Sequence, residues 1–278
     1  MKGQSMRKFI SLTSDFGVQT QGVGIMEGTA LSIAPDANVV HLMHGLPEFD
    51  VVAAARTMET VQYLPVGSHV CVCDPGVGTA RRAIICQVAR GDYLVGPDNG
   101  VLGPAGRVLG GVLAAHEITN RAYMREPVSA IFHGRDIFTP AAAHLANGVR
   151  IGEFGPSVDP DDLVSAPYQE AIGEDGCIHG KIIQINRYGS LHLNITHEQW
   201  DANGISEGDE ILLELTGHEP LKLRVCRTFG DVAEGVCLIL KDDYGRVEVA
   251  KNLGSFVQQY PVKIGDAVSV VFGSPDPA

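Results

Sequence analysis

The chain is poor in positive charge and contains no basic run. Only 21 of its 278 residues are Lys or Arg, against 33 Asp or Glu, which gives a formal net charge of −12. Proteins that bind nucleic acid usually present a basic face to the phosphates. We therefore expect no nucleic-acid partner, and a small neutral or cationic molecule fits this charge better than a polyanion does.

Long apolar runs and a secretory leader are also missing. No stretch reaches the roughly 20 apolar residues that span a bilayer. Residues 1–8 lead directly into a short apolar run, without the longer apolar region and cleavage site of a signal peptide. The six cysteines mostly lie inside apolar, strand-like runs. These features predict a cytoplasmic protein with reduced cysteines and no membrane partner.

The first half of the chain alternates strand and helix patterns. Strand patterns occur at 9–13, 38–42 and 69–73, and helix patterns at 24–34 and 50–58, with Asp50 as a suitable N-cap. The third strand is almost wholly apolar, which is typical of a strand covered on both faces. The alternation predicts an α/β domain with a largely parallel sheet over residues 1–160.

The second half has a different character. Residues 155–175 are rich in Pro, Asp, Gly and Ser and are typical of a linker. Helix patterns then fade, and short strand patterns follow at 181–185, 210–215, 221–225, 236–240, 247–249 and 267–271. This arrangement predicts a smaller all-β, barrel-like domain over residues 176–278.

Two acidic residues follow predicted parallel strands, Asp15 after the first and Asp74 after the third. Ligands of such sheets bind beyond the carboxyl ends of the strands, so both should face one rim. Asp74 opens a rigid, glycine-rich turn, and Arg81 lies within reach to fold back and keep the carboxylate ionised. His133 occupies another strand-to-helix junction. The three residues suggest acid–base chemistry, although a turn cap, a surface charge and a backbone-bonded histidine are equally consistent with the pattern.

Several familiar motifs are incomplete. Residues 22–28 hold one residue too many for a dinucleotide fingerprint, and residues 76–79 lack the lysine of a phosphate-binding loop. Residues 15–17 match a kinase tripeptide without any other kinase element. Cys71 and Cys73 share one strand face, but neighbouring valines favour buried core over a metal site. We expect no cofactor and no metal.

The sequence resembles the S-adenosyl-L-methionine hydroxide adenosyltransferases, relatives of the fluorinase and chlorinase enzymes. The resemblance covers nearly the whole chain, and its most specific blocks are Asp-Pro-Gly-Val-Gly-Thr and Gly-Pro-Asp-Asn-Gly. The matching segments are 13–17, 44–49, 74–79 with Arg81 and Arg82, 96–102, 132–136, 186–189 and 247–252.

The resemblance implies a homotrimer of two-domain subunits, with sites for a small-molecule nucleoside substrate at the subunit interfaces. It implies hydrolysis of S-adenosyl-L-methionine to adenosine and L-methionine, by attack of activated water or hydroxide at the 5′ carbon, without a cofactor. The catalytic set of that branch corresponds to Asp74, Arg81 and His133. Its halogenating branch has an aromatic residue in place of the Asp, so Asp74 and His133 point to hydrolysis.

The resemblance also implies a binding set. Asp15 should hold the ribose hydroxyls, and Phe49 should pack near the sugar or the sulfonium. Further substrate-binding positions are Asn186, Tyr188, Ser190, Asp243, Tyr244, Lys251 and Asn252.

Several positions depart from the family pattern. Asn186 replaces an Asp that contacts the methionine ammonium, and Ser190 replaces an Asn that binds the nucleoside. Asp243 and Tyr244 replace a serine-led pair near the adenine. Thr20, Gly22, Glu27 and His41 stand where Asp, Tyr, Lys and Asp are usual. Two alternatives therefore stay open: a non-catalytic adenosine- or nucleoside-binding protein on the same scaffold, and an enzyme acting on another 5′-substituted adenosine.

Overall fold

The computed structural model describes residues 8–174 and 176–272. The chain divides into two compact units, which meet along the sequence between Pro167 and Tyr168. The first is an α/β unit and the second a β-barrel, which confirms the predicted fold class. Within the described ranges, no helix combines the length and apolar character needed to cross a bilayer.

The first unit is built on one seven-stranded sheet. Four strands at one side of the sheet are parallel, and the remaining three alternate in direction. The strands follow the spatial order β2 (Asn38–Met43), β1 (Phe9–Ser14), β3 (Ser68–Val72), β5 (Tyr93–Pro97), β4 (Ala83–Val88), β6 (Val112–Glu117) and β7 (Ser157–Val158).

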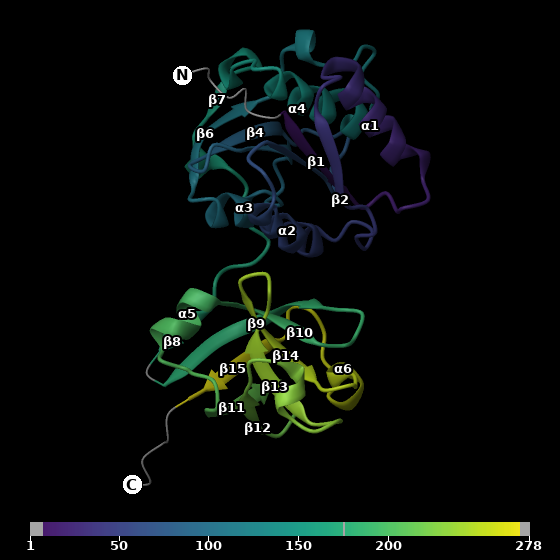
Figure 1. Ribbon diagram of the computed structural model, residues 1–278. Coiled ribbons are helices and arrows are strands. Elements are labelled where there is room, and N and C mark those ends of the chain that lie inside the picture. The colour runs from purple at the N-terminus through teal and green to yellow at the C-terminus, as the bar shows by residue number, and fades with distance from the viewer. Residues whose placement is uncertain (1–7, 175, 273–278) are drawn as a thin grey trace, which may run out of the picture. The chain divides into compact units, whose positions relative to one another are not determined.

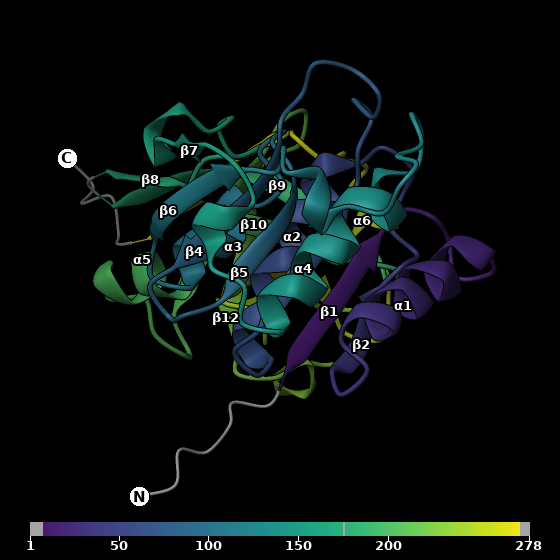
Figure 2. The ribbon, with the colours of Figure 1, turned by 90° about the horizontal axis from the view of Figure 1, so that it is seen from above.

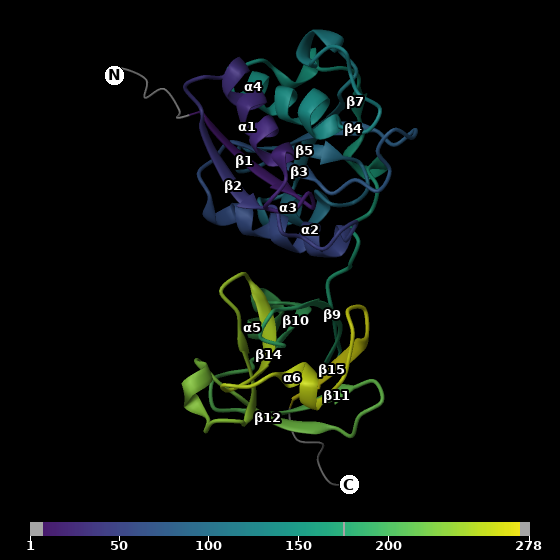
Figure 3. The same ribbon diagram turned by 90° about the vertical axis from the view of Figure 1, so that its right-hand side faces the viewer.

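Helices cover both faces of this sheet. On one face lie α1 (Gln21–Ile33) and α4 (Thr139–Ala146), and on the other α2 (Val51–Glu59) and α3 (Gly103–Val108) (Figures 1 and 3). Seen from above, α1 and α4 lie side by side (Figure 2). Asp50 caps α2 as predicted, since its Oδ1 accepts from the amide of Ala53 at 2.9 Å.

A π-helical turn leads into α4. This turn, η3 (Gly134–Phe138), begins directly after His133 and buries Phe138 completely. The predicted helix in this region is present, but its first turn is wider than an α-helix. Single π turns of this kind recur at functional sites, because they reorient the residues beside them. Short 3₁₀ helices are found at η1 (Thr60–Tyr63), η2 (Arg121–Tyr123), η4 (Ile151–Glu153), η5 (Pro160–Asp162) and η6 (Phe229–Asp231).

The second unit closes seven strands into a barrel. Pairing between β9 and β10 closes the ring, and β8 is added outside β9. Alternate side chains of β11 point inward, as the period of two requires. The strands are β8 (Ile172–Glu174), β9 (Cys177–Ile185), β10 (Leu191–Thr196), β11 (Glu210–Leu215), β12 (Leu221–Val225), β13 (Cys237–Lys241), β14 (Arg246–Lys251) and β15 (Ala267–Val271), with short helices α5 (His197–Ala202) and α6 (Phe256–Gln259).

Candidate active site

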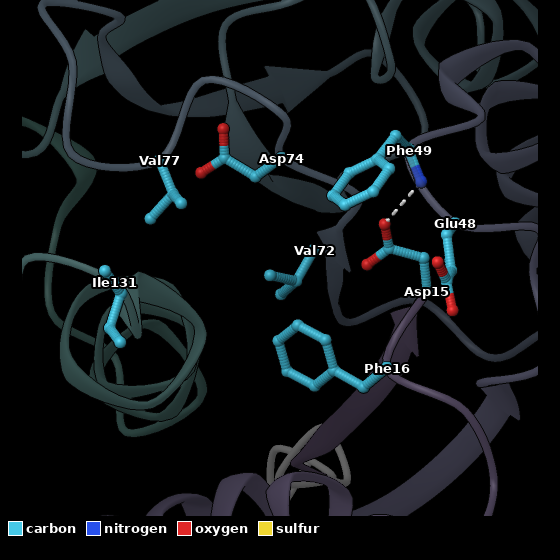
Figure 4. Close-up of a pocket in the computed structure, with 8 residues that line it drawn as sticks. All are labelled: Asp15, Phe16, Glu48, Phe49, Val72, Asp74, Val77 and Ile131. Carbon is cyan, nitrogen blue, oxygen red and sulfur yellow. Dashed lines mark hydrogen bonds between the residues drawn. The ribbon is translucent and has the colours of Figure 1, made fainter.

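A cavity of about 260 Å³ lies beyond the carboxyl ends of β1 and β3. Asp15 and Asp74 both line it, so the predicted shared rim is confirmed. Figure 4 shows the two carboxylates approaching it from different sides, Asp15 beside Phe49 and Asp74 beside Val77. The complete wall consists of Asp15, Phe16, Glu48, Phe49, Val72, Asp74, Val77 and Ile131.

The segment after β3 folds back on itself through two successive tight turns. Residues 74–77 and 76–79 each close with a hydrogen bond of 3.1 Å between the first carbonyl and the fourth amide. Gly78 has φ of +77°, and a Cβ there would lie 2.7 Å from the carbonyl oxygen of Ala130. Only glycine fits this position without moving the neighbouring chain. The two turns return Arg81 to the start of the segment.

Arg81 joins the other two predicted catalytic residues. Its Nε lies 3.0 Å from both carboxylate oxygens of Asp74, and its Nη2 also pairs with that carboxylate. The same Nη2 donates to Nδ1 of His133 at 2.6 Å. The Arg81 and Asp74 side chains are 11% and 5% exposed, and the guanidinium stacks over Phe138 at 5.1 Å. An ion pair so withdrawn from water holds its geometry better than a surface pair does.

His133 is a neutral acceptor toward Arg81. Burial, followed by the positive charge of Arg81, lowers the pKa of His133 below its usual range. A guanidinium only donates, so Nδ1 of the imidazole accepts and its proton resides on Nε2. In this state His133 has no second nitrogen free to accept a proton. Neither Arg81 nor His133 belongs to the cavity wall: Arg81 is linked to the cavity through Asp74, and His133 through Arg81.

The Gly-Pro-Asp-Asn-Gly block supports the site from behind. Asn99 donates through Nδ2 to the carbonyl of Cys73 at 2.9 Å and so fixes the residue that precedes Asp74. Asp98 accepts from Nε of Arg82 at 2.7 Å. Of the two consecutive arginines, it is therefore Arg81 that faces Asp74.

Asp15 holds the opposite side of the cavity. Its Oδ2 accepts from the amide of Phe49 at 3.0 Å, the dashed line in Figure 4. Phe49 has φ of +62°, a strained conformation for a residue with a side chain, and the residue as a whole is 67% exposed. Burial and the charge of Asp15 raise the pKa of the Cys73 thiol, which stays protonated and hydrogen-bonds to this carboxylate. Asp15 thus fixes an exposed aromatic ring at the cavity.

Asn186 serves a turn in the barrel unit. Its Oδ1 accepts from the amides of Tyr188 and Ser190 at 3.0 and 3.1 Å, which caps the connection between β9 and β10. Its Nδ2 lies 3.4 Å from Oε1 of Glu248 and 3.3 Å from Nε2 of His192. The amide therefore presents its NH₂ group to a carboxylate and commits its oxygen to the backbone.

The other barrel candidates fall into two groups. Lys251 and Asn252 lie at the end of β14 nearest the Asn186 turn, since Leu191 pairs with Val249. Asp243 and Tyr244 occupy the turn before β14, at its other end. A six-residue strand is roughly 20 Å long, so the structure separates these groups within the barrel.

A second cavity, of about 620 Å³, lies in the barrel unit. Asp243 is the sole predicted binding residue in its wall, beside Asp201, Arg227 and Lys241. No three His, Cys, Asp or Glu side chains in residues 8–174 and 176–272 are placed to share a metal ion.

Known families match both units. The model of the SAM hydroxide adenosyltransferase N-terminal domain matches residues 10–155, and that of the C-terminal domain matches residues 180–269. The chain belongs to the SAM hydroxide adenosyltransferase family.

Curated relatives cover almost the full length of this family member. An (R)-S-adenosyl-L-methionine hydrolase of Salinispora tropica is 40% identical, over 95% of this chain and 98% of its own. One from Thermus thermophilus is 33% identical over 93% and 97%. A fluorinase of Nocardia brasiliensis is 24% identical over 96% and 98%. The crystal structure of an uncharacterized conserved protein from Thermotoga maritima superposes with a TM-score of 0.86 at 30% identity, over 94% of this chain and 99% of that one.

Five wall residues of this adenosyltransferase-family cavity were not predicted from the sequence. Phe16, Glu48 and Val77 lie inside segments that carry the family resemblance, so their position beside Asp15, Phe49 and Asp74 was a usable signal. Val72 ends β3 and looks like ordinary core. Ile131 had no signal, because an apolar residue that is 81% exposed in a loop can only be recognised in the structure.

Proposed function

We propose that this protein hydrolyses S-adenosyl-L-methionine to adenosine and L-methionine. The observation that supports this most directly is the contact of one guanidinium, that of Arg81, with both Asp74 and His133 beside a cavity. Relatives named for this hydrolysis at 33–40% identity support the substrate.

The reaction is a displacement at the 5′ carbon. The oxygen of water forms a bond to this carbon while the carbon–sulfur bond breaks and its electron pair passes to sulfur. The sulfonium becomes the neutral thioether of methionine, and the water loses one proton. Because the sulfonium leaves readily, the protein has mainly to place the water in line and exclude competing poses.

Asp74 is the group that orients the water. It is the one member of the three that lines the cavity, and its carboxylate retains lone pairs beyond those that Arg81 occupies. Arg81 fixes the Asp74 carboxylate through its paired contacts, and His133 holds Arg81 in place from the far side. The released proton passes to Asp74 or to solvent, since Nδ1 of His133 already accepts from Arg81.

The cavity suits a cationic nucleoside. Asp15 offers its carboxylate to the ribose hydroxyls, and Phe49 and Phe16 present aromatic rings that stabilise a nearby sulfonium. The substrate-binding role extends to the barrel positions Asn186, Tyr188, Ser190, Asp243, Tyr244, Lys251 and Asn252. These complete the site in a homotrimer with sites at subunit interfaces, and light scattering should then give three times the mass of one chain. No cofactor takes part.

Turnover in ¹⁸O-labelled water tests this proposal. Purified protein should convert S-adenosyl-L-methionine to methionine and to adenosine carrying ¹⁸O at the 5′ hydroxyl. Asp74→Asn should lower kcat by roughly 100-fold or more, because the water loses its charged acceptor. Glu153→Gln, an exposed acid of the same unit, should match the wild type. Unlabelled adenosine, no products, or full activity in Asp74→Asn would each contradict the mechanism.

The contacts of Asn186 support one alternative, a substrate that is another 5′-substituted adenosine without an amino-acid tail. Its carbonyl oxygen is occupied by the turn and it carries no charge, so an amino-acid tail gains little there. An enzyme for another 5′-substituted adenosine would turn over tail-less sulfonium analogues faster than S-adenosyl-L-methionine. A non-catalytic nucleoside-binding protein would instead bind adenosine and convert neither.

A further inference from the structure

A chain of hydrogen bonds runs from the surface of α1 to the end of β1. Oε2 of Glu27 lies 3.2 Å from Nε2 of His41, and Nδ1 of His41 lies 2.8 Å from Nε2 of His44. Nδ1 of His44 then lies 2.7 Å from Oγ of Ser14. Glu27 and His41 are partly exposed, whereas His44 and Ser14 are buried. None of the four lines the cavity.

When the rings of His41 and His44 are both neutral, the hydrogen bonds can run in only one direction, with each donor on the Ser14 side and each acceptor on the Glu27 side. The carboxylate of Glu27 only accepts, so His41 donates from Nε2 and must accept at Nδ1. His44 therefore donates from Nε2 and accepts the Ser14 hydroxyl proton at Nδ1. Burial and the proximity of His41 lower the pKa of His44 to about 4, which keeps its ring neutral. Every donor in the chain then faces an acceptor.

The chain ends at the two segments that carry half of the cavity wall. Ser14 Oγ accepts from the amide of Phe16 at 3.4 Å, a long contact, and the carbonyl of His44 accepts from the amide of Gly17 at 2.7 Å. His44 thereby ties residues 14–17 to residues 44–49. These segments hold Asp15, Phe16, Glu48 and Phe49.

We propose that Ser14, His41 and His44 are positioning residues of this cavity. Their hydrogen bonds, whose direction is fixed by the carboxylate of Glu27, hold Asp15 and Phe49 in place relative to each other. This inference rests on the proposed function for the identity of the ligand. The groups act through the backbone of the two segments and do not touch the substrate.

The same strand provides a matched control. Ser11 Oγ lies 2.8 Å from Nδ1 of His69, whose Nε2 lies 3.0 Å from Oδ1 of Asp92. All three side chains are fully buried, and none belongs to the cavity wall. Ser11→Ala and Ser14→Ala thus remove the same hydroxyl from the same strand, with only the second removal next to the cavity.

Binding and kinetics test the proposal. Ser14→Ala should raise KM for S-adenosyl-L-methionine and Kd for adenosine about 5- to 10-fold, with kcat changed less than about 3-fold. Ser11→Ala should lower stability similarly and leave both constants unchanged. His44→Asn, whose Oδ1 can accept from Ser14, should bind better than His44→Phe. Equal constants in the two serine variants would overturn the proposal.

A readout without ligand separates this proposal from the proposed function. Hydrogen exchange at the amides of Phe16 and Gly17 should be about 5-fold faster in Ser14→Ala than in Ser11→Ala. Nitrogen NMR near pH 7 should show His44 neutral with its proton on Nε2. The proposal would be overturned by a charged His44, by a His44 proton on Nδ1, or by equal hydrogen exchange in the two serine variants. Failure of the wild type to bind adenosine or convert S-adenosyl-L-methionine would overturn the proposed function and leave these measurements valid.

Discussion

Arg81 occupies the centre of the site without lining the cavity. Its fork contacts Asp74 with Nε and Nη2, and Nη2 also contacts His133. A lysine ammonium has the charge but lacks the planar fork that makes both contacts. The geometry of this arginine, rather than its charge alone, therefore connects the three residues.

Arg81→Lys should consequently lower kcat by roughly 10- to 100-fold, because the water-orienting carboxylate loses its fixed position. The Kd for adenosine should change little, since Arg81 is absent from the cavity wall. Steady-state turnover and calorimetric adenosine binding measure the two effects. A kcat equal to that of the wild type would show that charge alone is sufficient.

Three histidines make stability depend on pH in the mildly acidic range. Burial lowers the pKa of His44 to about 4, and burial also lowers the pKa of His133 and of His144 below 6.5. The unfolded chain then binds more protons than the folded one as the pH falls below 6.5, so stability is lost on acidification. Carboxyl groups with lowered pKa, such as Asp136, add to this loss only below about pH 3.8.

The free energy of unfolding should therefore fall between pH 7 and pH 4.5, by up to about 1.4 kcal/mol per pH unit for each histidine. His144→Gln removes one of these groups without touching the cavity wall and should reduce the slope. Urea unfolding at several pH values measures it. A flat profile across this range would contradict the lowered histidine pKa values.

Single residues were predictable where chemistry and position coincide. Asp15 and Asp74 follow strands whose apolar pattern is clear, and Arg81 is the right distance along a glycine-rich turn. Asn186 was not interpretable in this way, because an amide that caps a turn and one that binds a ligand look alike in a sequence. Ile131 depends on a loop whose course only tertiary packing determines.

The turn after β3 is the element that assembles the site. Gly78 has a left-handed backbone and lies against Ala130, so it faces both a conformational and a steric constraint. Gly111 has φ of +100° with open space around its Cβ position, so it shares only the conformational constraint. Substitutions at Gly78 and Gly111 therefore separate the effect of the steric contact from the effect of the backbone conformation.

Gly78→Ala should move the turn away from Ala130 and lower kcat at least about 10-fold, since Arg81 no longer returns to Asp74. Gly111→Ala should cost about 1 kcal/mol of stability and leave turnover unchanged. Thermal unfolding and turnover on both variants provide the comparison. Equal activity in the two would mean that contact with Ala130 does not matter.

Regular elements were predictable in proportion to their apolar pattern. The strands β1 and β3 and helix α2 have strong patterns and lie where expected. The strands β6 and β10 were missed, since β6 contains two alanines and a terminal glutamate and β10 alternates with His192 and Asn194. Those two polar side chains are buried on the outer face of the barrel, where hydrogen bonds satisfy them. Such tertiary partners override local preference and are invisible in the sequence.

The two units have separate hydrophobic cores. One gathers Ile10, Val70 and Phe138, and the other gathers Leu193, Trp200 and Val249. The predicted change of composition along the chain therefore corresponds to a change of core. Each unit buries enough apolar side chains to fold by itself.

A fragment of residues 168–278 should accordingly fold alone as a barrel. It should give a β-type circular dichroism spectrum and a single cooperative unfolding transition, because its strands close on themselves and leave only β8 at an edge. It should not hydrolyse S-adenosyl-L-methionine, since it lacks Asp74. A fragment that is disordered would show that the barrel depends on the first unit.

The buried Ser11, His69 and Asp92 have one further implication. They reproduce the residue types and the order of contacts of a serine-hydrolase triad, but with the two ring nitrogens exchanged, since Nδ1 of His69 faces the serine and Nε2 faces the aspartate, and the hydroxyl is buried away from solvent. No acyl group can reach such an oxygen, and the three side chains instead stabilise the contact between β1 and β3. A triad recognised by interatomic distance alone would make this protein an esterase. Reagents that label activated serines should not react with Ser11, because a buried hydroxyl is inaccessible to them and serves only a structural role.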